Sequence, residues 1–226
     1  DAAYSDLAIT FLTDLSKSLL KDKLARAFPD LITFAYFCRK SNLLNFKKSH
    51  LDESVEHNRF GWGVCLHIAP ANIPMNFAFS FIMGFLSGNK NIVRLPSKKF
   101  EQINIFLEHF KGIMVKDSFK VLACNNHFVR TARDSNKLIS IVSRVDALVV
   151  WGGNSTVNKF RQFDKKPACV ESYFPDRVSS LLLNCDQLLK KTPAEMDKLC
   201  VDFFNDTYLV DQNACSSASM ICWFSQ

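Results

Sequence analysis

The 226-residue chain is long enough for one large domain or two small ones, and 48% of its residues are hydrophobic, which allows a sizeable buried core. Its net charge of +6 is mild and the basic residues are scattered, so the composition favours a solvated surface or an anionic ligand over a nucleic-acid partner. With only 7 Gly and 7 Pro, a collagenous or linker-rich chain is excluded.

The eight cysteines form no CxxC pair and no His/Cys cluster at zinc-ligand spacing, so we expect neither a disulfide framework nor a metal site. Cys65, Cys124 and Cys200 lie in apolar runs, where a small buried thiol is the usual outcome. This usage indicates a reducing, cytoplasmic location. The longest apolar run, 75–86, is too short to span a bilayer, and the first residues lack the features of a signal peptide.

The N-terminal segment, 1–59, is predicted to be helical up to about residue 45 and to end in a polar loop over 47–59. Its first helix has apolar residues on one face at helical spacing, namely Leu7, Phe11, Leu15 and Leu19. We interpret this segment as a packing layer. The chain begins without methionine and ends directly after an apolar run, 220–224, so we expect a piece of a longer protein.

The next stretch predicts a βαβ unit. A short apolar run at 64–69 is followed by a turn at 70–74, an apolar helix at 75–86 and a second apolar run at 91–95. Such strands are parallel, and ligands bind where parallel strands end. We therefore expect function at the loops that follow both runs.

Strands and helices continue to alternate to about residue 205, which predicts a doubly wound parallel α/β sheet over 60–205. The predicted helices and strands are 100–114, 119–124 (strand), 133–143, 147–150 (strand), 154–163, 168–170 (strand), 178–183 (strand) and 192–204. Asn154 or Ser155 is expected to cap the helix at 154–163. Thr192, with Pro193 and Glu195 after it, is typical of a helix start.

One cysteine stands apart from the others. Cys215 lies in the polar, small-residue segment DQNACSS, which can expose a thiol to a substrate. A nucleophilic cysteine needs such access and help in forming the thiolate. An inert loop cysteine fits the segment as well.

Five stretches, HIAPANIPMN, LSGNKNIVRLPSK, WGGNSTVNKF, PDRVSS and DQNACSS, occur in an order that resembles the aldehyde dehydrogenase superfamily. Within it, the chain is most similar to the fatty acyl-CoA reductases of the bacterial bioluminescence (Lux) type. The resemblance covers 61–226. It implies a Rossmann-type cofactor domain, an N-terminal helical layer (1–59) and only the start of a catalytic domain (206–226).

The resemblance implies that an acyl thioester is reduced to an aldehyde through an acyl-cysteine. Cys215 would be the nucleophile, and Asn72 would form an oxyanion hole with the Cys215 backbone N–H. A turn asparagine that bonds its own backbone is the alternative for Asn72. Glu171 corresponds to the general base of oxidising relatives, but Ser172 and Tyr173 replace the two glycines that usually follow that acid.

The resemblance also implies where a nicotinamide cofactor binds. Arg94, Ser97 and Lys98 fall in the loop that holds the adenosine ribose, and cations there favour the 2′-phosphate of NADPH over NADH. The other expected cofactor-binding residues are Ile68, Ala69 and Pro70 after the first strand, and Gly152, Gly153 and Asn154 at a helix N-terminus. The segment 125–135 lacks the glycines that many relatives have there.

Further expectations concern partners. The resemblance implies an acyl-CoA or acyl-protein substrate, an acyl-protein synthetase partner and a homo-oligomer for the full-length protein. Two other functions stay open: a truncated or inactive nucleotide-binding module, and a cysteine acyltransferase or hydrolase without a nicotinamide cofactor.

Overall fold

The computed structural model describes residues 2–51, 59–208 and 211–225, and the chain divides into two compact units, Asp1–Phe174 and Pro175–Gln226. The N-terminal helices pack on the same core as the sheet, whereas 175–205, which the sequence analysis grouped with the nucleotide-binding domain, belongs to the second unit. The functional division at 59/60 and 205/206 stays a prediction.

The first unit begins with a helical layer, as predicted. Helix α1 (Asp6–Lys21) is capped by Ser5, whose hydroxyl accepts a hydrogen bond from the Ala8 N–H. Of the predicted apolar face, Phe11, Leu15 and Leu19 are buried, whereas Leu7 is exposed. Helices α2 (Pro29–Phe37) and α3 (Lys40–His50) follow. The polar loop predicted at 47–59 is wrong for its first residues, because α3 continues to His50; residues 52–58 lie outside the described residues.

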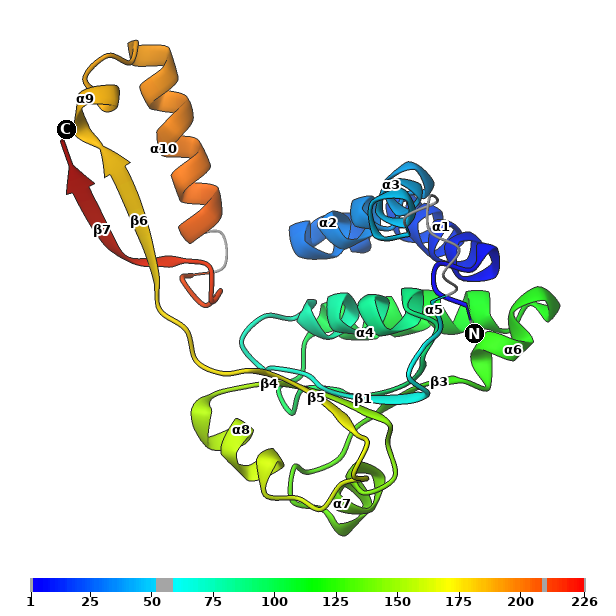
Figure 1. The fold of residues 1–226 in the computed structure, drawn as a ribbon. Helices are drawn as coiled ribbons and strands as arrows, with labels where there is room; N and C mark the ends of the chain where they lie inside the picture. The colour runs from blue at the N-terminus through cyan, green and yellow to red at the C-terminus, as the bar shows by residue number, and fades with distance from the viewer. Residues whose placement is uncertain (1, 52–58, 209–210, 226) are drawn as a thin grey trace. The chain divides into compact units, whose positions relative to one another are not determined.

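A five-stranded parallel sheet with the order β3-β2-β1-β4-β5 lies at the centre of this unit. Its strands are β1 (Val64–Ile68), β2 (Lys90–Arg94), β3 (Asn126–Val129), β4 (Ala147–Trp151) and β5 (Val170–Phe174). Helices α4 (Asn76–Leu86) and α5 (Glu101–Met114) cover one face, and α7 (Asn136–Val142) and α8 (Asn154–Arg161) cover the other (Figure 1). This arrangement confirms the doubly wound α/β prediction.

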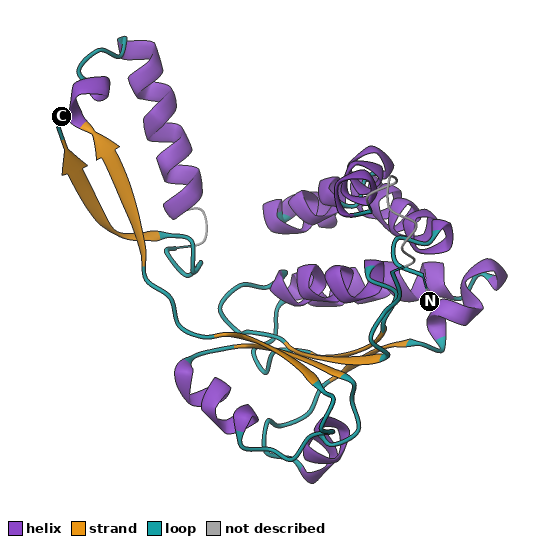
Figure 2. Ribbon diagram, in the orientation of Figure 1, coloured by secondary structure: helices purple, strands orange, loops and turns teal. Residues whose placement is uncertain are grey.

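Each face of the sheet has its own apolar core. On one face, edge-to-face phenylalanine contacts join α1, α4, α5 and β3, with ring centroids 5.0–5.9 Å apart. The rings are Phe11, Phe77, Phe106, Phe110 and Phe128. The other face is closed by Leu138 of α7 and by Val157 and Phe160 of α8. Figure 2 distinguishes the helices from the strands by colour.

The strand predicted at 119–124 is wrong. Residues Asp117–Phe119 form a 3₁₀ turn, helix α6 (Lys120–Ala123) follows, and β3 begins only at Asn126. Phe119 and Leu122 are buried while the two residues between them are exposed, which is a spacing of three and helical. Cys124 and Cys200, which were predicted to be buried, are both exposed. Cys65 is buried as predicted.

The second unit consists of β6 (Ser179–Asn184), α9 (Cys185–Leu188), α10 (Pro193–Thr207) and β7 (Ala218–Phe224). The two strands pair in parallel, and α10 is the crossover. The predicted helix start is confirmed: the Thr192 hydroxyl accepts from the Glu195 N–H, and the Glu195 carboxylate accepts from the Thr192 N–H. The capping box therefore fixes where α10 begins.

Candidate functional site

The carboxyl ends of the five parallel strands meet along one edge of the first unit. There the chain leaves β1 toward α4 on one face and leaves β4 toward α8 on the opposite face. Adjacent strands whose connections diverge in this way create a crevice that binds ligands in doubly wound sheets. Among the predicted cofactor residues, Ile68, Ala69 and Pro70 are buried in this edge, where the Ala69 N–H donates to the Arg94 carbonyl at 3.1 Å.

Arg94 ends β2 and is 1% exposed. Its Nε donates to the Thr131 carbonyl at 3.0 Å and its Nη2 to the Ser97 hydroxyl at 2.8 Å. Its Nη1 is buried and has no hydrogen-bond partner among the described residues. Burial lowers the pKa of Arg94, and the nearby positive charge of Arg133 lowers it further. The guanidinium is thus held in place with one donor left over.

Arg133 was missed by the sequence analysis. Its Nη1 donates to the Thr156 hydroxyl in the first turn of α8 at 2.9 Å, and its Nε is buried without a partner in the part of the chain that the structure describes. The segment after β3 therefore brings a second cation to the carboxyl edge. The available signal was that the segment 125–135 carries two arginines and no glycine.

The remaining predicted cofactor residues are Gly152, Gly153 and Asn154 between β4 and α8, and Lys98 after β2. A Cβ on Gly152 would lie 3.1 Å from Thr156, so this glycine allows β4 and α8 to pack closely. Gly153, and not Asn154 or Ser155 as predicted, is the N-cap residue of α8. Lys98 is exposed and its Nζ lies 5.0 Å from the Phe100 ring centroid, a contact that an ordinary surface lysine makes equally well.

Asn72 and Cys215, the predicted catalytic pair, belong to different units. Asn72 is exposed in the loop between β1 and α4. Cys215 is exposed in a turn that the Ser217 N–H closes on the Ala214 carbonyl at 3.0 Å. The Ser179 hydroxyl donates to the Cys215 carbonyl at 2.6 Å, which fixes this turn against β6. The structure therefore presents both groups to solvent, and their pairing stays a prediction.

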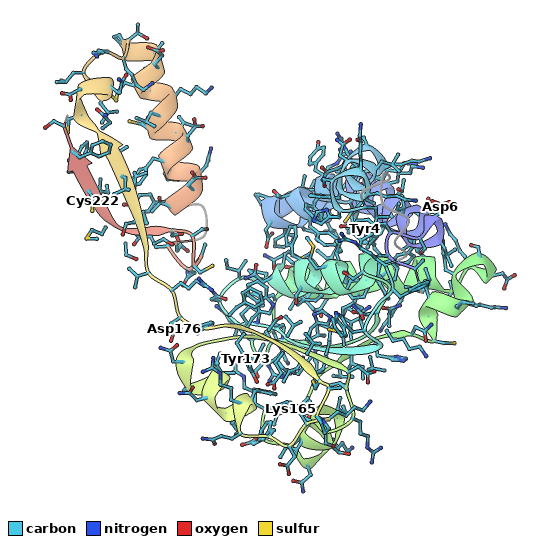
Figure 3. The ribbon with its side chains drawn as sticks, viewed as in Figure 1. Tyr4, Asp6, Lys165, Tyr173, Asp176 and Cys222 are labelled. Atoms are coloured by element: carbon cyan, nitrogen blue, oxygen red, sulfur yellow. The ribbon has the colours of Figure 1, made fainter. Side chains whose placement is uncertain are left out.

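Glu171 is engaged in contacts of its own. Lys165 Nζ lies 3.2 Å from its carboxylate, and the Tyr173 hydroxyl donates to the same oxygen. Figure 3 labels both partners. In the register of the sheet, Glu171 lies opposite Leu148 of β4. The end of β1 lies level with Val150 and Tyr173, so Glu171 is two positions short of the carboxyl edge. These contacts favour a structural role over that of a general base.

A buried polar network crosses the sheet near the same strands. His67 Nδ1 lies 2.8 Å from the Ser80 hydroxyl and Nε2 lies 3.1 Å from Asn91 Oδ1, while Asn91 donates to Asn126 Oδ1 at 2.8 Å. Trp151 Nε1 donates to Ser80 at 3.0 Å. His67 is thus buried in the core, whereas His127 lies exposed on β3.

Replacing His67 with Gln is expected to flatten the pH dependence of stability. Burial lowers the pKa of His67 to about 4, against about 6.5 in an unfolded chain. Between these values the unfolded state binds the proton and the native state does not. Stability is therefore full above pH 6.5 and falls as the pH falls toward 4, by up to about 3 kcal/mol.

Urea denaturation between pH 7.5 and pH 4.5 measures this effect. The His67→Gln variant should lose most of the pH slope, whereas His127→Gln, which changes an exposed strand histidine, should retain it. An unchanged slope in His67→Gln would contradict the assignment.

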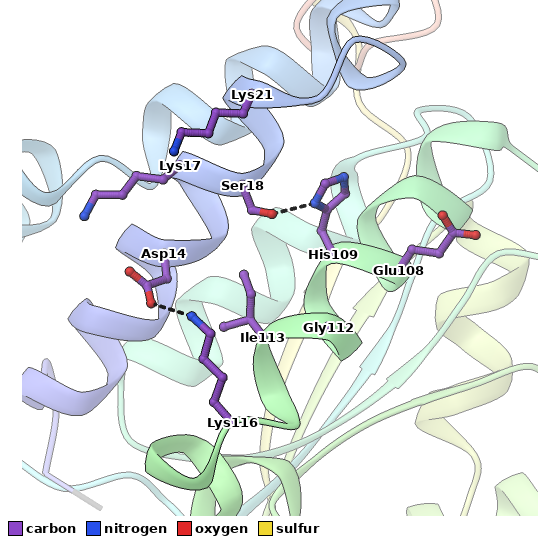
Figure 4. Close-up of a pocket in the computed structure, with 9 residues that line it drawn as sticks. All are labelled: Asp14, Lys17, Ser18, Lys21, Glu108, His109, Gly112, Ile113 and Lys116. Atoms are coloured by element: carbon purple, nitrogen blue, oxygen red, sulfur yellow. Dashed lines mark hydrogen bonds and ion pairs between the residues drawn. The ribbon is translucent and has the colours of Figure 1, made fainter.

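A surface hollow of about 620 Å³ lies between α1 and α5, away from the carboxyl edge of the sheet. There His109 Nδ1 is 2.7 Å from the Ser18 hydroxyl and Nε2 is 2.8 Å from an Asp22 carboxylate oxygen; Figure 4 shows the Ser18 contact. This resembles a hydrolase triad in atom types, but Ser18 lies within α1, and the interior N–H groups of that helix are used by its own hydrogen bonds and cannot form an oxyanion hole. The hydrogen bonds instead join α1 to α5, and they lower the pKa of Asp22.

In the described residues, no cluster of three or more acidic, histidine or cysteine side chains could hold a metal ion. Within the same part of the chain, none of the helices combines the length and apolar character needed to cross a bilayer.

The sheet order and the diverging loops define a chain with the fold of the aldehyde dehydrogenases. A putative aldehyde dehydrogenase from Burkholderia cenocepacia superimposes with a TM-score of 0.67 at 15% identity over 98% of this chain and 48% of that one. PnpE, solved in complex with nicotinamide adenine dinucleotide, gives 0.67 at 12% identity over 96% of this chain and 46% of that one. At these identities, the likeness shows the fold alone.

Residues 3–225 match the acyl-CoA reductase (LuxC) family, and the chain belongs to that family. A long-chain acyl-protein thioester reductase of Vibrio harveyi is 24% identical over 166 residues. The match covers 72% of this chain and 32% of that relative, so the chain spans about a third of the relative's length. Both findings confirm the resemblance that the five sequence stretches indicated.

Proposed function

We propose that this chain takes part in the NADPH-dependent reduction of a long-chain fatty acyl-CoA or acyl-protein thioester to the aldehyde, through an acyl group carried on Cys215. The observation that carries the proposal is an exposed thiol in a hydrogen-bonded turn, in a member of the acyl-CoA reductase family. The Vibrio harveyi relative, which is named for an acyl-protein thioester, supports the substrate class.

In the first step, the Cys215 thiolate attacks the acyl carbonyl. The carbon–sulfur bond to the donor breaks, the acyl–Cys215 bond forms, and the donor thiolate takes up a proton as it leaves. Negative charge develops on the acyl oxygen, and the Asn72 side-chain amide with the Cys215 backbone N–H would donate hydrogen bonds to it. Asn72 and Cys215 are both exposed, which supports these roles.

The carboxyl edge of the sheet fits a dinucleotide, since the buried Nη1 of Arg94 is a donor that an anionic group would satisfy. Arg94, Ser97 and Lys98 would hold the adenosine ribose, with Ile68, Ala69 and Pro70 beside it and Gly152, Gly153 and Asn154 near the pyrophosphate. When bound there, the nicotinamide would supply the hydride that reduces the acyl group. The aldehyde then leaves, and the electron pair of the broken carbon–sulfur bond stays on Cys215.

Glu171 has no necessary part in this reaction. The acyl group passes to a hydride and not to water, so no residue has to activate water. The contacts of Glu171 with Lys165 and Tyr173 agree with a structural role.

The partners follow from the same proposal. An acyl-protein donor would require a synthetase that makes it, and we propose such an enzyme as a partner. Homo-oligomerisation and a cytoplasmic location belong to the full-length protein and stay predictions.

Incubation with hexadecanoyl-CoA and NADPH tests the function. One aldehyde is expected for each NADPH oxidised, with NADH giving a lower rate at equal concentration. Release of fatty acid without oxidation of NADPH would contradict the proposal and would instead indicate a cysteine hydrolase.

A further inference from the structure

An apolar groove with a volume of about 410 Å³ lies beside α4, on the face of the sheet that this helix covers. Alternate residues of a strand point to the same face of a sheet, and alternate residues of β4 and β5 form the floor of the groove. One wall is the side of α4 that carries Phe79 and Met83. The groove therefore runs along the strands. The floor residues are Ala147, Val149, Trp151, Val170, Ser172 and Phe174.

One end of the groove lies at the carboxyl edge of the sheet. Trp151 and Phe174 are the last residues of β4 and β5, and their rings stack with centroids 3.9 Å apart and an interplanar angle of 8°. Asn76, the first residue of α4, also lines the groove, and it follows the loop that contains Asn72. A ligand in the groove can therefore extend to the loop that the proposed reaction uses.

The other end of the groove lies at the amino edge and is only partly closed. Trp62, two residues before β1, is 69% exposed, and Met83, near the end of α4, is 50% exposed. The floor strand β4 rises by about 13 Å from Ala147 to Trp151. An extended alkyl chain of about ten carbons covers that distance, because each carbon–carbon bond of about 1.5 Å advances the chain by about 1.3 Å. Since Trp62 lies beyond the start of the floor, the groove has the length of a long acyl chain.

The lining of the groove selects an apolar ligand over a charged one. Ser80 Oγ accepts a hydrogen bond from Trp151 Nε1 at 3.0 Å and lies 2.8 Å from His67 Nδ1. The Asn89 side chain donates to the Gly84 carbonyl at 3.2 Å, so these polar groups are already used within the protein. Among the described residues that line the groove, none is an aspartate, glutamate, lysine or arginine. An alkyl chain would exclude water from this surface without stranding a charge.

We propose that the groove holds the acyl chain of the thioester substrate, with its carbonyl end near Trp151 and Phe174 and its methyl end at Trp62 and Met83. The last two residues then limit the chain length, and neither is among the predicted site residues. The proposal rests on the proposed function, because it takes its ligand from that reaction. The long-chain acyl-protein thioester reductase of Vibrio harveyi supports a ligand of this length.

The three tryptophans of the chain provide the test, because Trp62 and Trp151 lie at opposite ends of the groove and Trp223 lies in the second unit. Bromine quenches indole fluorescence only at close range. Two forms of hexadecanoic acid are titrated into the protein below the concentration at which they aggregate, one brominated at carbons 4 and 5 and the other at carbon 16. Both are expected to quench the fluorescence saturably.

Tryptophan variants then give the direction of the chain. Trp62→Phe should abolish quenching by the acid brominated at carbon 16 and retain quenching by the other acid, which comes from Trp151. Trp223→Phe is the matched control, because it removes a tryptophan that is 61% exposed in the second unit, and it should change neither result.

A further variant tests the limit on chain length. Met83→Trp fills the amino end of the groove and should weaken binding of hexadecanoic acid by about 10- to 100-fold, since burial of each methylene contributes about fourfold in affinity. Binding of dodecanoic acid, measured by competition with a brominated acid, should change less than twofold. Val121→Trp introduces the same ring at a position on α6 that is 61% exposed, and it should change neither affinity.

The proposal is overturned if neither brominated acid quenches saturably, if Trp223→Phe abolishes the quenching, or if Met83→Trp weakens binding of both unbrominated acids equally. Because a free acid binds without a nucleophile, these titrations are independent of the proposed reaction. A protein that binds the acids in the expected direction but forms no acyl-cysteine would retain the groove and lose the proposed function. Acylation of Cys215 without quenching would retain the function and overturn the groove.

Discussion

Replacing Cys215 with alanine is expected to abolish transfer of an acyl group from hexadecanoyl-CoA to the protein, while nucleotide binding stays within twofold of the unmodified protein. The variant has no sulfur to form the thioester, and no other step of the reaction can begin without it. Because Cys215 is exposed in a turn, the smaller side chain leaves no buried cavity, so the effect on stability should be within about 0.5 kcal/mol.

Radiolabelled acyl-CoA followed by protein precipitation measures this transfer. The matched controls are Cys200→Ala and Cys124→Ala, which remove exposed thiols elsewhere in the chain and should retain full labelling. Full labelling of Cys215→Ala, with labelling lost in one of the controls, would move the nucleophile to another cysteine and contradict the assignment.

Replacing Asn72 with alanine is expected to lower the rate of acyl transfer by about 100- to 1000-fold, the typical loss when one oxyanion donor is removed. The loss should appear in kcat and leave nucleotide affinity unchanged, because the amide acts on charge that develops during the reaction. Asn72 is exposed in its loop, so the variant should remain folded.

Single-turnover labelling of Asn72→Ala gives this rate directly. Asn125→Ala is a suitable control, since its side-chain amide donates to the Val121 carbonyl and the residue lies just before β3, at the opposite edge of the sheet. A fall of less than about fivefold in Asn72→Ala would instead support the turn role that was left open for this residue.

The fold could be predicted largely because its signals are local. Turn residues flank the short apolar runs that form β1 and β2, so the ends of these strands can be predicted. The capping box at Thr192 marks the start of α10. The strand predicted at 119–124 failed because an apolar run of that length suits a strand or a buried helix equally. Only the packing of Phe119 and Leu122 into the core decides between them.

The candidate site was less accessible to sequence reasoning, since it depends on contacts across the sheet. Nothing near Arg133 indicates that it reaches Thr156 of α8, or that Arg94 would retain an unpaired donor. For Glu171, the place in the sequence matches a catalytic acid, whereas in the structure Lys165 and Tyr173 both contact its Oε2.

The most direct test of the central claim is a mass spectrum of the protein after a single incubation with hexadecanoyl-CoA, before and after addition of NADPH. One hexadecanoyl group is expected on the peptide that contains Cys215, sensitive to hydroxylamine, and NADPH should remove it as hexadecanal. A stable adduct that NADPH does not discharge, or an acyl group on any other peptide, would contradict the account.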